Sequence, residues 1–285
     1  MNTGEKKMIV FNSSLPRAGS TLLSNILGNN PDIYASPSSG LADAVHGAHY
    51  YWQNAEHTKT EGIEKRSESL KEFLRAGIKA YYNEITDKPY IIDKNRAWLR
   101  VGDFTDVLFP ECKMLCMVRH PFDIFASMEK LFRKNPMDNK ASGIVNYETL
   151  QGMTVDSRVN IWMNSAPLGH AFQSLYNTIQ AKLKDDIMYI PYESLTAQPE
   201  DVMRDIYKYL DIPYYKQDYN NIKQVTHEND EGILTNHIIR PKIEPVVQNP
   251  IEILGLESCL FIQQRLNWFF DYFGYQKVEV GESTK

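Results

Sequence analysis

Hydrophobic positions along the chain form two kinds of pattern. Short continuous apolar runs predict buried β-strands, and apolar residues spaced three to four apart predict amphipathic helices. The runs predict strands at 8–11, 90–93, 113–118 and 187–190. The helical spacing predicts helices near 21–27, 66–85, 97–108, 122–133, 155–183, 199–210 and 256–272. Residues 213–250 are expected to be mostly irregular.

The order of these segments indicates the fold class. Strands that alternate with helices predict an α/β protein, with a central mainly parallel sheet flanked by helices on both faces. We expect one domain over residues 1–285. In such folds ligands bind beyond the carboxyl ends of the strands. The unusual polar residues of this sequence follow the four predicted strands in turn: Arg17, Lys94, Arg119 and Tyr192.

Composition narrows the classes of protein. The chain has 285 residues, of which 42% are hydrophobic and 24% charged, and these are ordinary globular values. No apolar run approaches the roughly 18 residues of a membrane span, and the polar N-terminus lacks the pattern of a secretory signal. The formal net charge of -5 argues against a general polyanion binder. We therefore expect no nucleic-acid partner and no membrane span, and any anion site must be local.

The three cysteines do not predict a disulfide framework or a zinc site. Cys112 and Cys116 are four residues apart, and Cys259 lies far along the chain. No second pair of metal ligands accompanies them. We expect buried, neutral thiols, no bound metal and a reduced, cytoplasmic location. The polar run 227–230 is interpreted as a solvated loop, and His120, His170 and His237 are given no role.

The loop 16–21 has the features of an anion site. It joins a predicted strand to a predicted helix, so the first amides of the helix are available to an anion. Gly19 permits close approach, Ser20 and Thr21 carry hydroxyls, and Arg17 carries a permanent charge. A Walker A loop would need an earlier glycine and a lysine before Ser20, and both are missing. A capped helix with a surface arginine is the alternative interpretation.

This loop resembles the 5′-phosphosulfate loop of sulfotransferases, which are P-loop-like enzymes that use 3′-phosphoadenosine 5′-phosphosulfate (PAPS) as sulfuryl donor. The run 15–23 carries the resemblance. A second block, 117–127, has an arginine at a strand end and a serine eight residues later. The resemblance implies that Arg119 and Ser127 bind the 3′-phosphate of the donor. It also implies that 5′-phosphosulfate contacts come from the loop residues Arg17, Ala18, Gly19, Ser20, Thr21 and Leu22.

Two further blocks are most similar to the tyrosylprotein sulfotransferase type. Residues 92–95 resemble a strand end that carries a lysine near the transferred sulfuryl group, a role this implies for Lys94 together with Arg17. Residues 191–195 resemble a block whose tyrosine packs near the adenine, which implies that role for Tyr192. Arg240 and its following proline resemble a late pair that closes over the donor, and the neighbouring Lys242 could serve as well.

The chain also departs from that type. The glutamate expected as general base is missing from the stretch 35–40, and Leu131 stands where a basic residue is expected, so Lys130 or Arg133 would substitute. The membrane anchor of that group is absent as well. These differences leave the acceptor open among tyrosyl peptides, carbohydrates, lipids and small phenols.

A base for the acceptor hydroxyl is sought in the stretch that follows. Asp43, His46 and His49 are spaced to share one side of a helix. Histidine titrates near neutrality, so His46 is the predicted catalytic base, with an ordinary polar helix as the alternative. The adjacent aromatic residues 50–52 would form an acceptor pocket, part of the core or a lid.

The resulting prediction is a soluble PAPS-dependent sulfotransferase that acts on an acceptor hydroxyl and leaves 3′-phosphoadenosine 5′-phosphate (PAP) as product. Two other functions remain open. One is a P-loop nucleotide kinase or phosphotransferase with a degenerate loop, although Lys94 after Asp93 favours sulfuryl transfer. The other is a non-catalytic module that binds PAP or another nucleotide. A homodimer is compatible with the sequence.

Overall fold

The computed structural model describes residues 7–134, 152–182, 186–228 and 237–279. A parallel five-stranded sheet lies at its centre, with the strand order β2-β3-β1-β4-β5. The strands are β1 (Met8–Asn12), β2 (Ile33–Ser38), β3 (Tyr90–Lys94), β4 (Met114–Val118) and β5 (Ile187–Pro191). The predicted α/β class with a parallel sheet is therefore confirmed.

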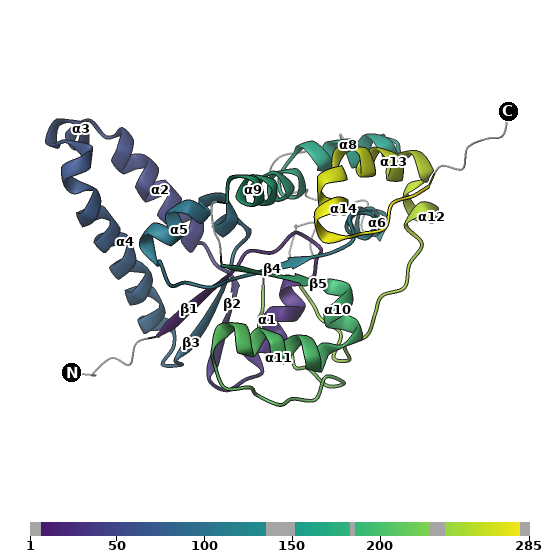
Figure 1. The fold of residues 1–285 in the computed structure, drawn as a ribbon, viewed down its shortest axis with the longest axis horizontal. Helices are drawn as coiled ribbons and strands as arrows, with labels where there is room; N and C mark the ends of the chain where they lie inside the picture. The colour runs from purple at the N-terminus through teal and green to yellow at the C-terminus, as the bar shows by residue number, and fades with distance from the viewer. Residues whose placement is uncertain (1–6, 135–151, 183–185, 229–236, 280–285) are drawn as a thin grey trace.

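Helices cover both faces of the sheet (Figure 1). One face carries α1 (Ser20–Gly28), α10 (Tyr192–Ala197) and α11 (Pro199–Leu210). The other face carries η1 (Arg96–Val101), α5 (Gly102–Leu108), α6 (Pro121–Lys134), α8 (Val155–Asn164), α9 (Leu168–Ala181), α13 (Leu256–Arg265) and α14 (Asn267–Phe273). A short α12 (Pro250–Leu254) lies beside α6. The helices α2 (Leu41–Asn54), α3 (Glu56–Glu61) and α4 (Ile63–Ile85) project from one end of the molecule.

The strand count is a correction to the sequence analysis, which predicts four strands. The additional strand, β2, contains Pro37 and two serines and lies at an edge of the sheet, where its register with β3 shifts between Ala35 and Ser38. A proline is tolerated at an edge or an irregularity because no ladder hydrogen bond is lost there. Strand β2 has no continuous apolar run, so the sequence pattern does not predict it. As an edge strand it pairs on one side only, and polar residues are tolerated there.

Three predicted helices are divided in the structure. The helix expected at 97–108 is the 3-10 helix η1 followed by α5. The helix expected at 155–183 is α8 followed by α9, because Pro167 lacks an amide donor and Ser165 adopts an extended conformation. The helix expected at 256–272 is α13 followed by α14, with the break at Leu266. The irregular backbone predicted for 213–250 is confirmed for the described residues of that range.

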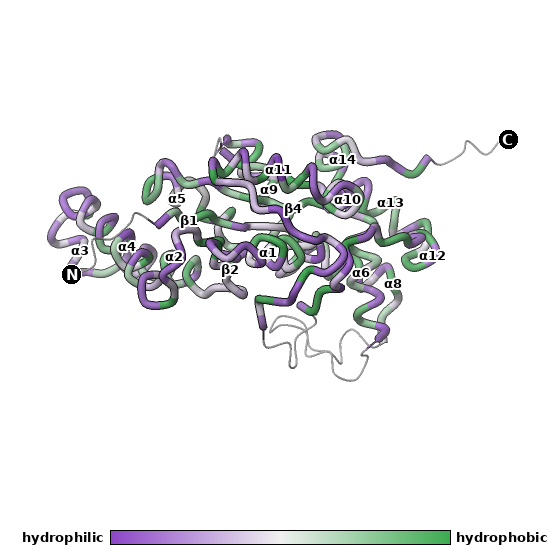
Figure 2. The backbone as a smooth tube through the Cα atoms, turned by 90° about the horizontal axis from the view of Figure 1, so that it is seen from below, coloured by the Kyte–Doolittle hydropathy of each residue, from purple (hydrophilic) through white to green (hydrophobic). Residues whose placement is uncertain are grey.

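The hydrophobic core holds the strands in place and leaves their carboxyl ends polar. Every residue of β4 is buried, and only Met8 of β1 is partly accessible. Above the sheet, Phe125 of α6 stacks on Phe172 of α9, which contacts Phe269 of α14. Hydrophilic residues dominate the projecting α3, whereas apolar residues concentrate along the central strands (Figure 2). Among the described residues, no helix has the length and apolar character needed to span a bilayer.

Candidate functional site

A cavity of about 770 Å³ opens at the carboxyl ends of the strands. Parallel strands end at one edge of a sheet, so residues that follow different strands meet there. Its lining includes nearly all of the predicted donor-site residues: Arg17, Gly19, Ser20, Thr21, Leu22, Lys94, Arg119, Ser127, Tyr192 and Arg240. The structure thus brings the polar residues of the strand ends together in one cavity, and their roles stay predictions.

The loop before α1 has an unusual backbone. Arg17 and Gly19 have φ angles of 60° and 95°, in the region that favours glycine. A Cβ atom on Gly19 would lie 2.6 Å from Cδ2 of Tyr192, so a larger residue would collide with that ring. Ala18 differs from its neighbours: its side chain is buried in the core and its amide donates to the carbonyl of Leu15 at 3.2 Å. Gly19 thus lets the helix start and the tyrosine ring lie in contact.

Arg119 is held beside this loop. Its Nη1 donates to the carbonyl oxygen of Arg17 at 3.1 Å, and its guanidinium lies 4.4 Å from the centre of the Tyr192 ring. Arg17 in turn donates from Nε to Ser127 Oγ at 3.1 Å. The predicted pair Arg119 and Ser127 therefore meets around Arg17, although the residues come from the end of β4, from α6 and from the first loop.

The buried guanidinium of Arg119 has a donor left over. The side chain is only 7% exposed, and its Nε has no hydrogen-bond partner among the described residues. Burying an unsatisfied charged donor costs free energy unless a ligand completes it. The donor set of Arg119, Arg17 and Ser127 fits a phosphate, which accepts hydrogen bonds through several oxygens.

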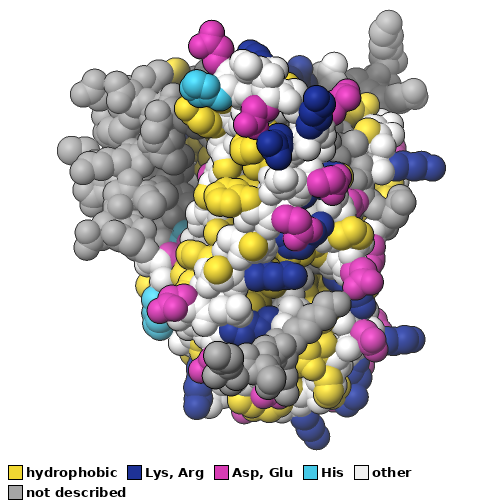
Figure 3. Space-filling model, turned by 90° about the vertical axis from the view of Figure 1, so that its left-hand side faces the viewer, with side chains coloured by type: hydrophobic (Ala, Val, Ile, Leu, Met, Phe, Trp, Pro, Cys, Tyr) yellow, Lys and Arg dark blue, Asp and Glu magenta, His cyan; other side chains and the backbone are white. Residues whose placement is uncertain are grey.

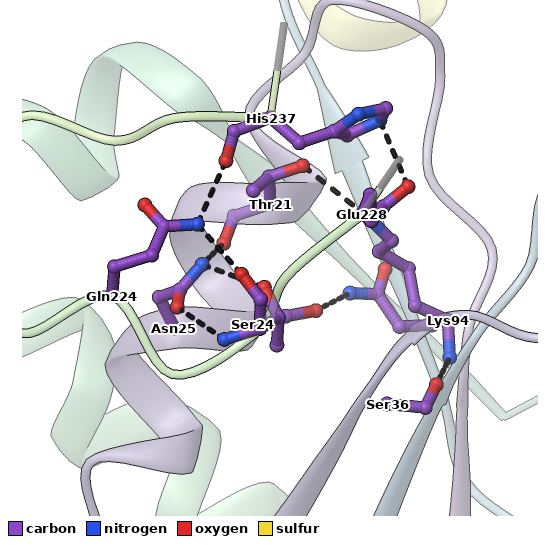
Figure 4. Close-up of polar contacts among 10 residues, drawn as sticks. Thr21, Ser24, Asn25, Ser36, Lys94, Gln224, Glu228 and His237 are labelled. Atoms are coloured by element: carbon purple, nitrogen blue, oxygen red, sulfur yellow. Dashed lines mark hydrogen bonds and ion pairs between the residues drawn. The ribbon is translucent and has the colours of Figure 1, made fainter. Parts of the chain in front are cut away.

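Lys94 ends β3 at the centre of the cavity. Its backbone amide donates to Ser36 Oγ at 2.9 Å, which ties the strand end to β2. Its Nζ donates to Thr21 Oγ1 at 3.3 Å and forms an ion pair with Glu228 (Figure 4). The ammonium therefore faces the start of α1, where helix amides also favour negative charge.

Asp93 supports Lys94 from behind. Its carboxylate is fully buried and accepts hydrogen bonds from Ser39 at 2.5 Å, Tyr82 at 2.7 Å and Trp98 at 3.0 Å. Burial raises the pKa of Asp93, and the three hydrogen bonds oppose that rise. The network anchors β3 to α4 and η1, so it fixes the strand end that carries Lys94.

Glu228 is a site residue that the sequence analysis misses. The interpretation of 227–230 as a solvated loop is wrong for this side chain, because only 9% of it is exposed. One carboxylate oxygen pairs with Lys94, and the other lies 3.1 Å from His237 Nε2. His227 is exposed, as expected, and residues 229 and 230 lie outside the described residues. The only signal in the sequence is a carboxylate beside a histidine in an irregular segment.

The predicted base, His46, lies elsewhere. It is exposed on α2 and does not line the cavity, and Asp43, which does line it, pairs with Arg100 at 3.0 Å. The exposed Tyr50 and Tyr51 do not line the cavity either. Figure 3 shows the projecting end of the molecule, where hydrophobic and charged side chains are interspersed. The role of His46 stays a prediction without support from this geometry.

Lys130 and Arg133, the two candidates to replace a basic residue at position 131, differ in their position relative to the cavity. Lys130 lines the cavity and donates to Gln248 at 2.9 Å. Arg133 pairs with Glu129 at 2.7 Å, away from the lining residues. Lys242 lines the cavity beside Arg240 and pairs with Glu244 at 3.0 Å. Lys130 and Lys242 thus add positive charge to the cavity.

The cysteines take no part in this site. All three are buried, and burial raises the pKa of Cys116 to about 12 and of Cys259 to about 11. Both thiols are therefore neutral near pH 7. Within the described residues, no cluster of histidine, cysteine and carboxylate side chains has the arrangement of a metal site.

Comparison with known proteins supplies an independent view of the chain. A family model described as "Sulfotransferase family" matches residues 10–217. A protein-tyrosine sulfotransferase of Drosophila melanogaster is 24% identical over 212 residues, which are 72% of this chain and 38% of that protein. Protein-tyrosine sulfotransferase 1 of Danio rerio is 22% identical over 214 residues, 72% of this chain and 54% of that protein.

The chain thus covers about two fifths and about half of the length of these two relatives. Among solved structures, the sulfotransferase domain from the curacin biosynthetic pathway aligns with a TM-score of 0.51 and 14% identity, over 97% of this chain and 100% of that one. At this identity the likeness concerns the fold.

Proposed function

Because the chain belongs to the sulfotransferase family, we propose that it transfers a sulfuryl group from PAPS to a hydroxyl group of an acceptor. One observation carries the choice of donor: the buried Arg119, with its unsatisfied Nε, lies beside Ser127 and Arg17 in the cavity that Lys94 also lines. A donor with two separate phosphate groups needs two anion sites, and the cavity lining offers a candidate for each: Arg119 with Ser127, and Thr21 with Lys94.

In the proposed complex each anion site binds a different phosphate group of the donor. Arg119 and Ser127 hold the 3′-phosphate, and the first turn of α1 with Thr21 holds the 5′-phosphosulfate. Lys94 and Arg17 neutralise the charge that develops on the sulfuryl and leaving oxygens. Tyr192 stacks against Arg119 and provides an apolar surface for the adenine. Arg240 lines the same cavity near Tyr192 and, in the proposed complex, closes over the donor.

Calorimetry tests this assignment. PAP is titrated into the protein without metal, and ATP with magnesium is titrated separately. We expect PAP to bind more tightly, because only PAP carries the 3′-phosphate. A preference for ATP with magnesium would indicate a nucleotide kinase or phosphotransferase instead.

Arg119→Ala gives the residue-level test. Loss of a hydrogen-bonded charge pair costs about 1.5–3 kcal/mol, so PAP affinity should fall roughly 10–100-fold. Adenosine 5′-monophosphate, which lacks the 3′-phosphate, should lose little. Arg204→Ala is the matched control, since Arg204 is an exposed arginine on α11 paired with Glu200. Equal losses for both nucleotides would contradict the assigned role of Arg119.

Acceptor identity follows from a screen with labelled PAPS. Tyrosyl peptides are the first class to test, because the two similar animal proteins are named for protein tyrosine. Carbohydrates, lipids and small phenols complete the panel. PAP binding without transfer to any of them would favour a non-catalytic module. A single domain over 1–285, a homodimer and a cytoplasmic location stay predictions.

A further inference from the structure

The described residues that line the cavity include one histidine, His237. It reaches the cavity from the segment after α11, far in sequence from the other lining residues of β1 and α1. Its Nε2 lies 3.1 Å from Glu228 Oε2, and the Glu228 side chain is only 9% exposed. A buried carboxylate next to an imidazole nitrogen fixes the orientation and the tautomer of the ring.

The same carboxylate links this histidine to the centre of the site. Glu228 contacts Lys94 through Oε1 and His237 through Oε2, so a single carboxylate separates the imidazole from the ammonium (Figure 4). Lys94 is the residue that the proposed function assigns to the transferred sulfuryl group. The imidazole is therefore held within reach of the place where an acceptor hydroxyl would approach.

The backbone around this pair is also fixed. Gln224 donates from Nε2 to the carbonyl oxygens of Thr226 at 2.7 Å and His237 at 2.9 Å, and its Oε1 accepts from the amide of Ile239 at 2.9 Å. Asn25 of α1 binds the amides of Val225 and Thr226 at 2.6 and 2.9 Å. These bonds connect both ends of the Glu228–His237 pair to α1.

We propose that His237 is the catalytic base of the transfer and that Glu228 is its positioning residue. The inference rests on the proposed sulfuryl transfer. The proton of the acceptor hydroxyl passes to the Nδ1 of His237 while the oxygen forms a bond to sulfur. The bond between sulfur and the 5′-phosphate oxygen breaks, and its electron pair leaves with PAP. Glu228 then balances the charge of the imidazolium.

Glu228 contacts the imidazole of His237 directly, and Lys94 pairs with the same carboxylate. Arg96 lines the same cavity and interacts electrostatically with Glu228. Since Lys94 would turn to the sulfuryl group of a bound donor, the carboxylate then acts mainly on His237. Loss of Glu228 should therefore remove the negative charge that balances the imidazolium formed in the transfer.

The experiment measures PAP release from PAPS by the full chain, with the best acceptor of the screen and with water alone. We expect His237→Gln to lower kcat about 100-fold or more, within the range for loss of a general base, with the Kd for PAP unchanged. We expect Glu228→Gln to retain part of the activity and to shift the acidic limb of the kcat profile to lower pH. A merely structural role of Glu228 would not move that limb.

Two matched controls accompany these variants. His57→Gln removes an exposed histidine of α3, and Glu200→Gln removes a carboxylate of α11 that pairs with Arg204 outside the cavity. Both should keep the wild-type pH profile. A His237→Gln variant that binds PAP and turns over like wild type would overturn the proposal. A larger loss of kcat in His46→Gln than in His237→Gln would overturn it as well. If wild-type protein binds PAP but releases none from PAPS, the proposed transfer itself fails, and this assignment fails with it.

Discussion

Asp93 is a buried carboxylate next to Lys94 of the site. Ionisation of Asp93 costs folding free energy because the charge is buried. Burial raises its native pKa above the value in the unfolded chain. The stability that it contributes is therefore fully present below the unfolded pKa and is lost as pH rises through the native pKa. Once the carboxyl group is ionised, the protein carries this cost while Asp93 holds the three hydrogen bonds that fix β3.

Asp93→Asn should remove that pH dependence. The amide keeps the shape of the carboxyl group and does not titrate. The free energy of unfolding of wild type relative to the variant should therefore fall with rising pH, by about 1.4 kcal/mol for each unit of pKa shift. Denaturant unfolding over a pH series measures it, with Asp87→Asn, an exposed aspartate, as control. Parallel stability curves for wild type and Asp93→Asn would contradict the raised pKa.

Individual site residues were predictable to different degrees. Arg17, Gly19, Arg119 and Ser127 occur in short motifs whose spacing along one strand and helix already limits their positions. Glu228 and His237 have no such motif, because hydrogen bonds from Gln224 and Asn25 bring them to Lys94 through an irregular segment. Contacts of this kind depend on the folded backbone, so no local sequence pattern predicts them.

At the level of a secondary-structure element, the start of α1 depends on Gly19. Gly19→Ala would add a Cβ 2.6 Å from the Tyr192 ring at a φ of 95°, so the ring and the first turn of α1 must move apart. We expect a loss of about 1–3 kcal/mol in unfolding free energy from the strained backbone, and at least a tenfold loss in PAP affinity. Thermal unfolding and calorimetry measure the two effects.

Gly47→Ala is the control for this substitution. Gly47 lies inside α2, and a methyl group added there would have nothing within 4 Å, so alanine should stabilise the helix by roughly 0.5–1 kcal/mol. PAP affinity should not change. Similar PAP affinities for wild type and Gly19→Ala would show that the contact with Tyr192 is dispensable.

Elements with a clear hydrophobic period were predicted well, and those without one were not. The helix predicted at 199–210 coincides with α11, because its apolar stripe is uninterrupted and Pro199 begins it. The stripe over 155–183 is equally regular but says nothing about the break at Pro167 between α8 and α9. Strand β2 has no apolar period that would predict it. It forms because it pairs with β3 and packs against α1 in the folded protein.

At the level of the whole molecule, the cavity draws its lining from Asn12 to Gln248. A ligand there joins the ends of all five strands to the segment 237–248, so it should stabilise the fold as a unit. PAP at about 100 times its Kd should raise the free energy of unfolding by about 2.7 kcal/mol. Hydrogen exchange should slow together at the ends of β1, β3 and β4 and in 237–248. Protection confined to one of these segments would contradict a shared site.

The two edges of the sheet have a feature in common that concerns solubility. The edge strands β2 and β5 each contain a proline near the carboxyl end, Pro37 and Pro191, whereas β1, β3 and β4 contain none. Proline interrupts the row of amide donors that another chain would need for strand pairing. Edge-to-edge stacking of sheets is thereby disfavoured at the end where the cavity opens, which helps to keep the entrance clear of self-association.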